Sequence, residues 1–159
     1  LSDQKPLADL LAKQPDGTRV PRPLPQAPAW FSCFNVIQIN EDEMAQLGPD
    51  PLVVAAEALR QGCTAVCVTL GSRGAAYFSG TPIRTARIPA PAVHPPAFPS
   101  ASDPTGCGDV FGGAAAAALL GGASIEAAVR AGTQLGTRNL SHRGASGLRD
   151  HLMGKLSVA

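Results

Sequence analysis

The residues with the clearest chemical potential lie in one short stretch, Asp103 to Asp109, which reads Asp-Pro-Thr-Gly-Cys-Gly-Asp. Gly106 and Gly108 flank one small residue, and a carboxylate follows at once. Strong helix formers without proline come next, so the stretch predicts a glycine turn that opens onto a helix N-terminus. Unpaired backbone N–H groups and the helix dipole attract anions there, and glycines let a ligand approach the backbone closely.

Asp109 has two interpretations at this position. Asp is common in a first helical turn for capping and dipole reasons alone. A carboxylate beside an anion site repels phosphate, however, and this arrangement makes sense where the carboxylate takes a proton from a hydroxyl group that attacks phosphorus. The residue types and spacing leave both interpretations open.

The whole heptapeptide resembles the C-terminal signature of the ribokinase-like (PfkB-type) carbohydrate kinase family, Asp-x-Thr-Gly-Ala/Cys-Gly-Asp at the start of a long helix. The resemblance implies that Asp109 is the catalytic base. It also implies that Gly106, Cys107 and Gly108 form an anion hole, which stabilises charge on the transferred phosphoryl group. Thr105 is then expected beside the nucleotide.

A second motif, Asn40-Glu41-Asp42-Glu43, follows a short apolar strand expected at Val36–Ile39. Asn40 with Glu43 three residues later is typical of a capping box at the start of a helix. The same family carries Asn-x-x-Glu after a strand and before a helix, where the Glu helps to organise Mg²⁺ and its waters. The resemblance therefore implies that Asn40 and Glu43 belong to a magnesium site, with Glu43 acting through water, and the capping interpretation stands beside it.

A third motif follows an almost unbroken apolar run, Ala65–Leu70, which is typical of a parallel strand covered on both faces. The run ends in Gly71-Ser72-Arg73-Gly74 before a second strand resumes at Ala75–Phe78. Thr-Leu-Gly-x-x-Gly resembles the strand end of the family that lies beside ATP, which implies that Thr69, Gly71 and Gly74 contact the nucleotide. An ordinary hairpin turn is the alternative.

Further implied contacts lie after the heptapeptide. A helix is expected from Cys107 to Leu120, and Ser124 is expected to cap another. In the second helix Gly132 and its neighbours are small, which permits close helix packing or leaves room for an adenine ring. The resemblance implies nucleotide contacts at Gly132, at Thr133 and in a loop around Gly144 that closes the base pocket. It also implies a monovalent cation such as K⁺ at Asp103.

The fold expected from this resemblance is α/β, a three-layer ribokinase-like arrangement with a mostly parallel sheet between helices. At 159 residues the chain is one domain by length, with a nucleotide-binding and catalytic core at 35–146 and an irregular, proline-rich connector at 1–34. Within that connector a short amphipathic helix is expected at Pro6–Gln14. Relatives carry their sugar-binding residues in an N-terminal half that we expect to be absent here. A homo-oligomer or a separate N-terminal half is therefore an expected partner.

Composition narrows the function classes further. A net charge of +1 gives no reason to expect nucleic acid as a partner, and no apolar run approaches the roughly 20 residues that span a bilayer. The four cysteines have no metal spacing, which suits free thiols in a reducing cytoplasm. The P-loop pattern Gly-x-x-x-x-Gly-Lys-Ser/Thr is absent from the sequence.

The expected function is ATP-dependent phosphoryl transfer to a hydroxyl group of a sugar or related small molecule, with ATP and Mg²⁺ as cofactors. Two alternatives remain at this point. One is a non-enzymatic nucleotide-binding or interaction module that lacks the sugar-binding half. The other is a structural remnant that binds nothing.

Overall fold

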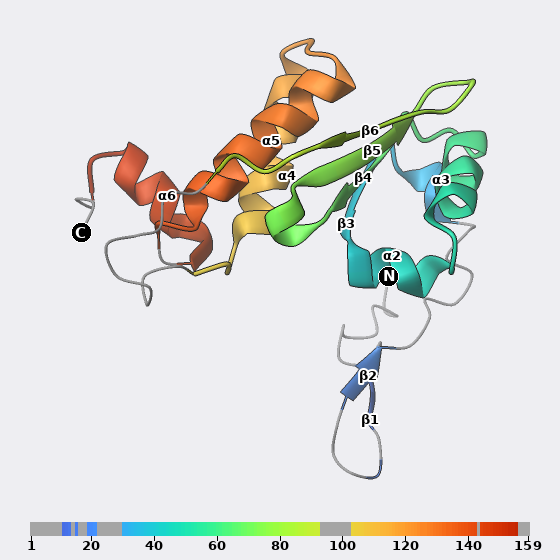
Figure 1. Ribbon diagram of the computed structural model, residues 1–159, viewed down its shortest axis with the longest axis horizontal. Helices are drawn as coiled ribbons and strands as arrows, with labels where there is room; N and C mark the ends of the chain where they lie inside the picture. Colours follow the sequence, from blue (N-terminus) through green and yellow to red (C-terminus); the bar gives the residue numbers. More distant parts are fainter. Residues whose placement is uncertain are drawn as a thin grey trace, which may run out of the picture.

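The computed structural model describes residues 11–13, 15, 19–21, 30–92, 103–142 and 144–155. A four-stranded sheet in the order β3-β4-β5-β6 lies between two layers of helices (Figure 1). The strands are β3 (Val36–Asn40), β4 (Ala65–Thr69), β5 (Ala75–Ser79) and β6 (Arg84–Ile88). The helices are α2 (Glu41–Leu47), α3 (Pro51–Arg60), α4 (Cys107–Leu120), α5 (Ile125–Asn139) and α6 (Gly144–Leu152). The expected three-layer α/β class is confirmed.

The sheet is mixed, so the expectation of a mostly parallel sheet is wrong for the described strands. Only β3 and β4 pair in parallel, whereas β4 with β5 and β5 with β6 pair antiparallel. The connections explain the difference. A short 3-10 turn, η3 (Gly71–Arg73), joins β4 to β5, and a turn of that length permits only an antiparallel return. Between β3 and β4 lie α2 and α3, which make the long crossover that a parallel pair needs.

Each face of the sheet packs on its own pair of helices. Val66 and Val68 of β4 belong to a core with residues of α2 and α3, while Cys67 between them belongs to a second core with residues of α4 and α5. This alternation is the period of two expected for a strand. It explains why β4 reads as a continuous apolar run, since both of its faces are covered.

Helices α4 and α5 pack closely because glycines face the contact. A Cβ atom at Gly132 would lie 2.9 Å from the Phe111 carbonyl oxygen, and one at Gly136 would lie 3.0 Å from that of Cys107. Of the two sequence interpretations for these small residues, close helix packing is confirmed. Ser124 caps α5 as expected, because its hydroxyl group accepts a hydrogen bond from the Ala127 N–H at 3.2 Å.

Two expectations about the chain ends are corrected. Within the segment 1–34, β1 (Leu11–Lys13) pairs antiparallel with β2 (Arg19–Pro21), so these residues form neither a helix nor an irregular connector. Residues 144–146, expected in a loop, open helix α6. The proline-rich approach to the heptapeptide at 93–102 lies outside the described residues. No helix among those described is long and apolar enough to cross a membrane.

Candidate active site

The predicted glycine turn forms at the start of α4. Gly106 has φ +81°, a left-handed conformation that favours glycine, and Cys107 begins the helix directly after it. The Thr105 N–H donates to the Asp103 carboxylate at 2.9 Å, which closes the turn before the glycine. Asp109 lies in the first helical turn and is exposed. The helix N-terminus therefore presents backbone donors and one carboxylate toward solvent.

Neither the backbone conformation nor the packing at position 108 requires a glycine. A Cβ atom at this position would meet nothing within 4 Å, and its φ is not in the left-handed region. The residue instead lines a pocket. A glycine there leaves the α4 N-terminus open to close approach by whatever the pocket holds.

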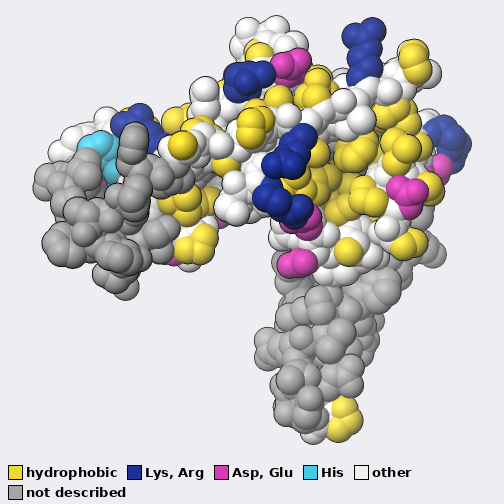
Figure 2. All heavy atoms as spheres, viewed as in Figure 1, with side chains coloured by type: hydrophobic (Ala, Val, Ile, Leu, Met, Phe, Trp, Pro, Cys, Tyr) yellow, Lys and Arg dark blue, Asp and Glu magenta, His cyan; other side chains and the backbone are white. Residues whose placement is uncertain are grey.

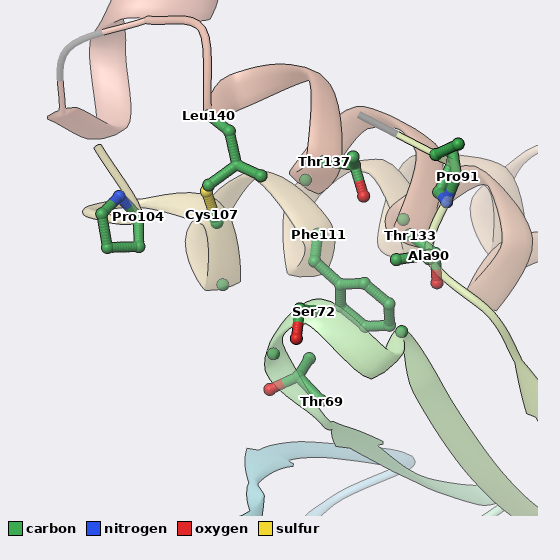
Figure 3. Close-up of a pocket in the computed structure, with 16 residues that line it drawn as sticks. Thr69, Ser72, Ala90, Pro91, Pro104, Cys107, Phe111, Thr133, Thr137 and Leu140 are labelled. Carbon is green, nitrogen blue, oxygen red and sulfur yellow. The ribbon is translucent and has the colours of Figure 1, made fainter. Parts of the chain in front are cut away.

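That pocket, with a volume of about 710 Å³, lies between the β4–β5 turn and helices α4 and α5 (Figure 3). Phe111 forms its apolar floor and projects from α4 toward the η3 turn. The other lining residues are Thr69, Gly71, Ser72, Gly74, Ala90, Pro91, Ala92, Pro104, Cys107, Gly108, Gly132, Thr133, Gly136, Thr137 and Leu140. The pocket thus brings together four segments that are separated in the sequence, 69–74, 90–92, 104–111 and 132–140.

Many of the predicted nucleotide contacts lie around this pocket. Seven predicted site residues line it: Thr69, Gly71, Gly74, Cys107, Gly108, Gly132 and Thr133. Thr105, Gly106, Asp109 and Gly144 are not among the lining residues. Gly74 also has a structural reason to be glycine, because its φ is +97° and a Cβ would lie 2.0 Å from the Ile88 carbonyl oxygen.

Asn40 and Glu43 form a reciprocal capping box at the start of α2. The Asn40 N–H donates to Glu43 Oε2 at 2.8 Å, and the Glu43 N–H donates to Asn40 Oδ1 at the same distance. Both residues are exposed. Asn40 is also the register partner of Thr69, so the motif lies at the same edge of the sheet as the pocket turn. Across the described residues, no three His, Cys, Asp or Glu side chains converge as a metal-binding group.

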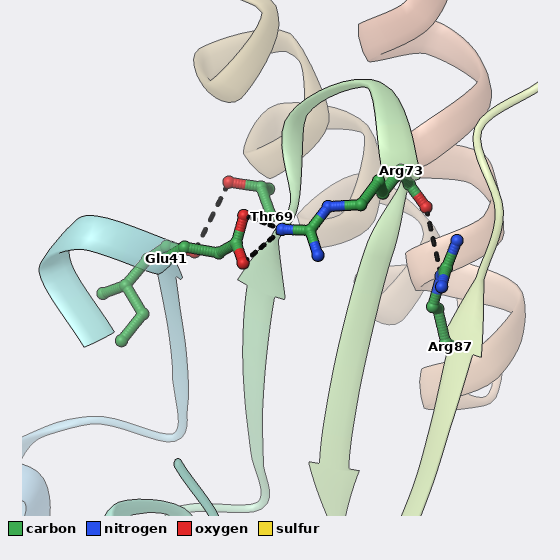
Figure 4. Close-up of polar contacts among 5 residues, drawn as sticks. Glu41, Thr69, Arg73 and Arg87 are labelled. Atoms are coloured by element: carbon green, nitrogen blue, oxygen red, sulfur yellow. Dashed lines mark hydrogen bonds and ion pairs between the residues drawn. The ribbon is translucent and has the colours of Figure 1, made fainter. Parts of the chain in front are cut away.

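An ion pair ties these two strand ends together (Figure 4). Arg73 in η3 donates to both carboxylate oxygens of Glu41 in the first turn of α2, and its own carbonyl oxygen accepts from Arg87 Nε at 3.3 Å. Both partners are about half exposed, so the pair adds little to overall stability. Its local consequence is to hold the capping-box motif beside the pocket turn.

Asp103 is engaged by backbone donors. Its Oδ1 accepts from the Thr105 N–H, and its Oδ2 accepts from the Gly144 N–H at 3.1 Å. This hydrogen bond connects Gly144, the first residue of α6, to the turn. The carbonyl oxygens of Thr105 and Gly144 both accept from Asn139 at the end of α5. The oxygens that would ligate a monovalent cation at this junction therefore already face N–H donors.

Cys107 is not activated for nucleophilic attack. Burial raises the pKa of its thiol, and the nearby Asp103 charge acts in the same direction, although the contact with Asn139 opposes them. A thiol with a raised pKa stays protonated at neutral pH, and the thiolate is the nucleophile. Cys107 therefore fits the turn as a small residue.

Sequence reasoning missed several residues of this region. Thr137 and Leu140 line the pocket together with the predicted Thr133, and their spacing of four and three residues places them on one helix face. Helical spacing from Cys107 likewise reaches Phe111. These periodicities were a usable signal. Asn139, which is fully buried, gave none, because a single Asn in a helix does not reveal what it contacts.

Comparison with known proteins adds family and fold. The family model described as pfkB family carbohydrate kinase matches residues 8–151. A ribokinase from Thermotoga maritima superimposes with a TM-score of 0.65 at 26% sequence identity, covering 82% of this chain and 46% of the ribokinase. No curated protein sequence matches the chain significantly.

Two further solved structures are similar. A protein from E. coli, provisionally named ribokinase II and solved in complex with ATP and Mg²⁺, has a TM-score of 0.64 at 26% identity, covering 79% of this chain and 40% of its own. Ribokinase from Arabidopsis thaliana, complexed with ribose and ATP, has a TM-score of 0.63 at 23% identity. The match covers 83% of this chain and 44% of the Arabidopsis chain. The chain thus spans less than half the length of these structures.

Proposed function

Because the chain belongs to the pfkB family of carbohydrate kinases, we propose that it is the nucleotide-side, C-terminal half of an ATP-dependent sugar kinase. The reaction is transfer of the γ-phosphoryl group of ATP to a hydroxyl group of a sugar or related small molecule. The observation that carries the proposal is the pocket, because it joins the β4–β5 turn, the glycine turn at α4 and the small-residue face of α5. The free cysteines suit a reducing compartment such as the cytoplasm.

ATP fits the character of the pocket. A volume of about 710 Å³ lies in the range of small-molecule sites, and the lining is mostly apolar with a few hydroxyl groups. The E. coli structure in complex with ATP and Mg²⁺ supports this ligand class. We place the base against Phe111 and the α5 face, with the phosphates toward Gly108 and the α4 N-terminus.

Mg²⁺ suits the carboxylate and amide oxygens at the end of β3 when it is held through its bound waters, because Asn40 Oδ1 and Glu43 Oε2 already accept backbone N–H groups. Hard oxygen donors suit this ion, which keeps several waters and needs no all-protein cage. We propose that Glu43 and Asn40 hold it through water beside the Thr69 turn, their register neighbour. When bound, the ion neutralises charge on the β- and γ-phosphates.

Asp109 and the glycine turn then have separate roles in the reaction. The Asp109 carboxylate accepts the proton of the attacking sugar hydroxyl group, which makes that oxygen a better nucleophile. The backbone N–H groups of Gly106 and Gly108 donate to the oxygens of the transferred group as charge develops, whereas the Cys107 N–H already donates to the Pro104 carbonyl oxygen at 3.1 Å. Asp109 is exposed and outside the pocket lining, so a sugar can approach it from the solvent side.

The exposed surface beside β3 supports the proposal that a second half of the enzyme packs there. Strand β3 lies at one edge of the sheet, and only β4 pairs with it among the described strands. Exposed hydrophobic side chains lie on neighbouring segments: Trp30, Phe34, Leu52 and Val53. Figure 2 shows hydrophobic side chains gathered over the sheet and α3. An open strand edge beside apolar surface favours pairing with another strand.

We therefore expect residues 1–159 alone to bind Mg-ATP, to self-associate and to phosphorylate no sugar. Positioning of the acceptor supplies much of phosphoryl-transfer catalysis, and among the described residues the pocket lining does not include Asp109. The measurements are the mass in solution, the melting temperature with Mg-ATP, and ATP turnover across a sugar panel. Nucleotide at 100 times its Kd should stabilise the fold by about 2.7 kcal/mol.

The possible outcomes distinguish among the three functions that the sequence left open. Absence of any shift with Mg-ATP would favour a structural remnant and contradict the proposal. Nucleotide binding without turnover, even after the sugar-binding half is restored, would favour a non-enzymatic nucleotide-binding module. A stable monomer that phosphorylates a sugar would contradict only the requirement for the second half.

Gly108→Ala should raise stability and weaken ATP binding together. Replacing a helical glycine by alanine adds up to about 1 kcal/mol of stability, and no protein atom obstructs the new methyl group. The methyl group enters the pocket where we place the phosphates, so we expect at least about tenfold weaker ATP binding. Thermal melting and calorimetric titration measure the two effects.

Gly113→Ala is the matched control, since Gly113 lies on the same helix, is exposed and also has open space at its Cβ. It should show the stability gain with unchanged ATP binding. Equal affinities for ATP in the two variants would show that the phosphates do not bind near Gly108.

A further inference from the structure

Asn139 occupies the junction behind the glycine turn. It is the last residue of α5, its side chain is 0% exposed, and none of the three sequence motifs includes it. The amide nitrogen Nδ2 donates to the carbonyl oxygens of Thr105 and Gly144, each at 3.2 Å. An amide NH₂ group has two hydrogens, which these two oxygens share with the Cys107 sulfur. One side chain thus joins the turn, the end of α5 and the start of α6.

The remaining groups at the junction are arranged around the same turn. Asp103 accepts the N–H groups of Thr105 and Gly144, and its own N–H donates to the Leu140 carbonyl oxygen at 3.2 Å. Asn139 Nδ2 also lies 3.8 Å from the sulfur of Cys107, the first residue of α4. Hydrogen bonds with Asp103 and Asn139 therefore hold the turn that presents the anion-binding N–H groups.

Asn139 is costly to the fold. Its Oδ1 is buried and has no hydrogen-bond partner, although most buried polar atoms have one. An unpaired buried carbonyl oxygen destabilises the folded state, although an apolar side chain in its place would leave the carbonyl oxygens of Thr105 and Gly144 without their donor. The two donor contacts to the turn and to α6 therefore explain Asn at this position.

A monovalent cation at this junction would need the oxygens that Asn139 and the backbone already engage. Such a cation exchanges its hydration shell for several carbonyl oxygens at once. Here the carbonyl oxygens of Thr105 and Gly144 share one amide group, and both oxygens of Asp103 accept N–H donors. The oxygens at this junction accept hydrogen bonds from amide groups, so they suit an amide as their partner and do not suit K⁺.

We propose that Asn139 is a positioning residue that holds the glycine turn in its phosphate-binding geometry, in the place that a monovalent cation would otherwise fill. This inference rests on the proposed kinase function. Two consequences follow. ATP binding by this chain does not depend on K⁺, and removal of the Asn139 amide weakens contacts to the phosphates while leaving the base site intact.

The test is calorimetric titration of residues 1–159 with ATP and with AMP, at constant Mg²⁺, in KCl and in tetramethylammonium chloride. At matched ionic strength we expect the wild-type affinity for ATP to agree within about twofold between the two salts. Asn139→Leu should bind ATP at least about tenfold more weakly, because charge-assisted hydrogen bonds to phosphate are lost. Its affinity for AMP should stay unchanged, and its melting temperature should fall only moderately, because the carbonyl oxygens of Thr105 and Gly144 lose their donor.

Two further variants make the result specific. Val129→Ala removes buried methyl groups from the same helix, so it should melt earlier and keep both nucleotide affinities. Asn139→Ala repeats the amide deletion with a smaller side chain, in case leucine packs poorly.

Several results would overturn the proposal. These are tighter wild-type ATP binding in K⁺ by about tenfold or more, wild-type ATP affinity in both Asn139 variants, or equal losses for ATP and AMP. Unfolding of both Asn139 variants would assign the residue to stability alone and would also overturn it. A wild-type chain that binds neither nucleotide would overturn the proposed function together with this inference.

Discussion

Asp109→Asn lowers the turnover number of the complete enzyme about 10²–10⁴-fold and leaves its affinity for ATP nearly unchanged. The test uses residues 1–159 joined to the sugar-binding half that we propose. Asn has the shape of Asp but cannot accept the proton of the sugar hydroxyl group, so only the chemical step is affected. Asp109 is exposed and does not line the pocket, which is why nucleotide binding should persist. Steady-state kinetics with a saturating sugar, together with ATP titration, measures both quantities.

Glu126→Gln is the matched control for this experiment. Glu126 is also an exposed acid in the first turn of a helix, α5, where it pairs with Arg130 at 2.9 Å. Its loss removes a similar interaction with the helix dipole, worth about 0.3–1 kcal/mol, without touching the glycine turn. If Asp109→Asn turns over at the parental rate, as Glu126→Gln should, the carboxylate has only a helix-end role.

Gly74→Ala destabilises the fold by at least about 3 kcal/mol. The new Cβ would lie 2.0 Å from the Ile88 carbonyl oxygen and 2.6 Å from the Ala90 nitrogen, and backbone atoms cannot move aside as a flexible side chain can. The φ of +97° adds strain for any residue with a Cβ. Thermal melting is the measurement, at about 2–4 °C per kcal/mol for a chain of this size.

Gly71→Ala separates steric overlap from backbone strain. Gly71 lies in the same turn with φ +58°, but a Cβ there meets nothing within 4 Å. Its substitution should therefore cost only about 1–2 kcal/mol, the left-handed strain alone. Equal melting temperatures for the two variants would show that the end of β6 and the residues after it do not pack closely on Gly74.

The elements with local stop and start signals were predictable from the sequence. Helix α4 runs from Cys107 to Leu120 as expected, because a glycine turn precedes it and Gly121 follows it. The capping box at Asn40 and Glu43 was also legible, and both of its hydrogen bonds form. Such signals act within four residues of the chain, so they need no knowledge of the tertiary fold.

The features that depend on tertiary contacts were not predictable in the same way. An apolar run such as β4 has the same pattern whether its neighbours are parallel or antiparallel, and the mixed sheet became clear only from the strand pairing. The role of Asn139 depends on carbonyl groups 34 and 5 residues away in sequence. The expected cation at Asp103 followed from family resemblance, whereas our proposal that Asn139 takes its place rests on the local hydrogen bonds of this chain.

The arrangement of the candidate site follows from one topological fact. Strands β3 and β4 are parallel, so Asn40 and Thr69 end side by side at one edge of the sheet. Ligands of open α/β sheets bind outside the carboxyl ends of such strands. The two motifs that the sequence assigned to metal and nucleotide are thereby neighbours, and α4 brings the glycine turn to the opposite wall of the same pocket.

A structure of this chain with Mg²⁺ and a non-hydrolysable ATP analogue tests the central claim most directly. We predict the base between Phe111 and the α5 face that carries Thr133, with the terminal phosphate at the N–H groups of Gly106 and Gly108. Nucleotide bound away from both the Thr69–Gly74 turn and the start of α4 would contradict the account.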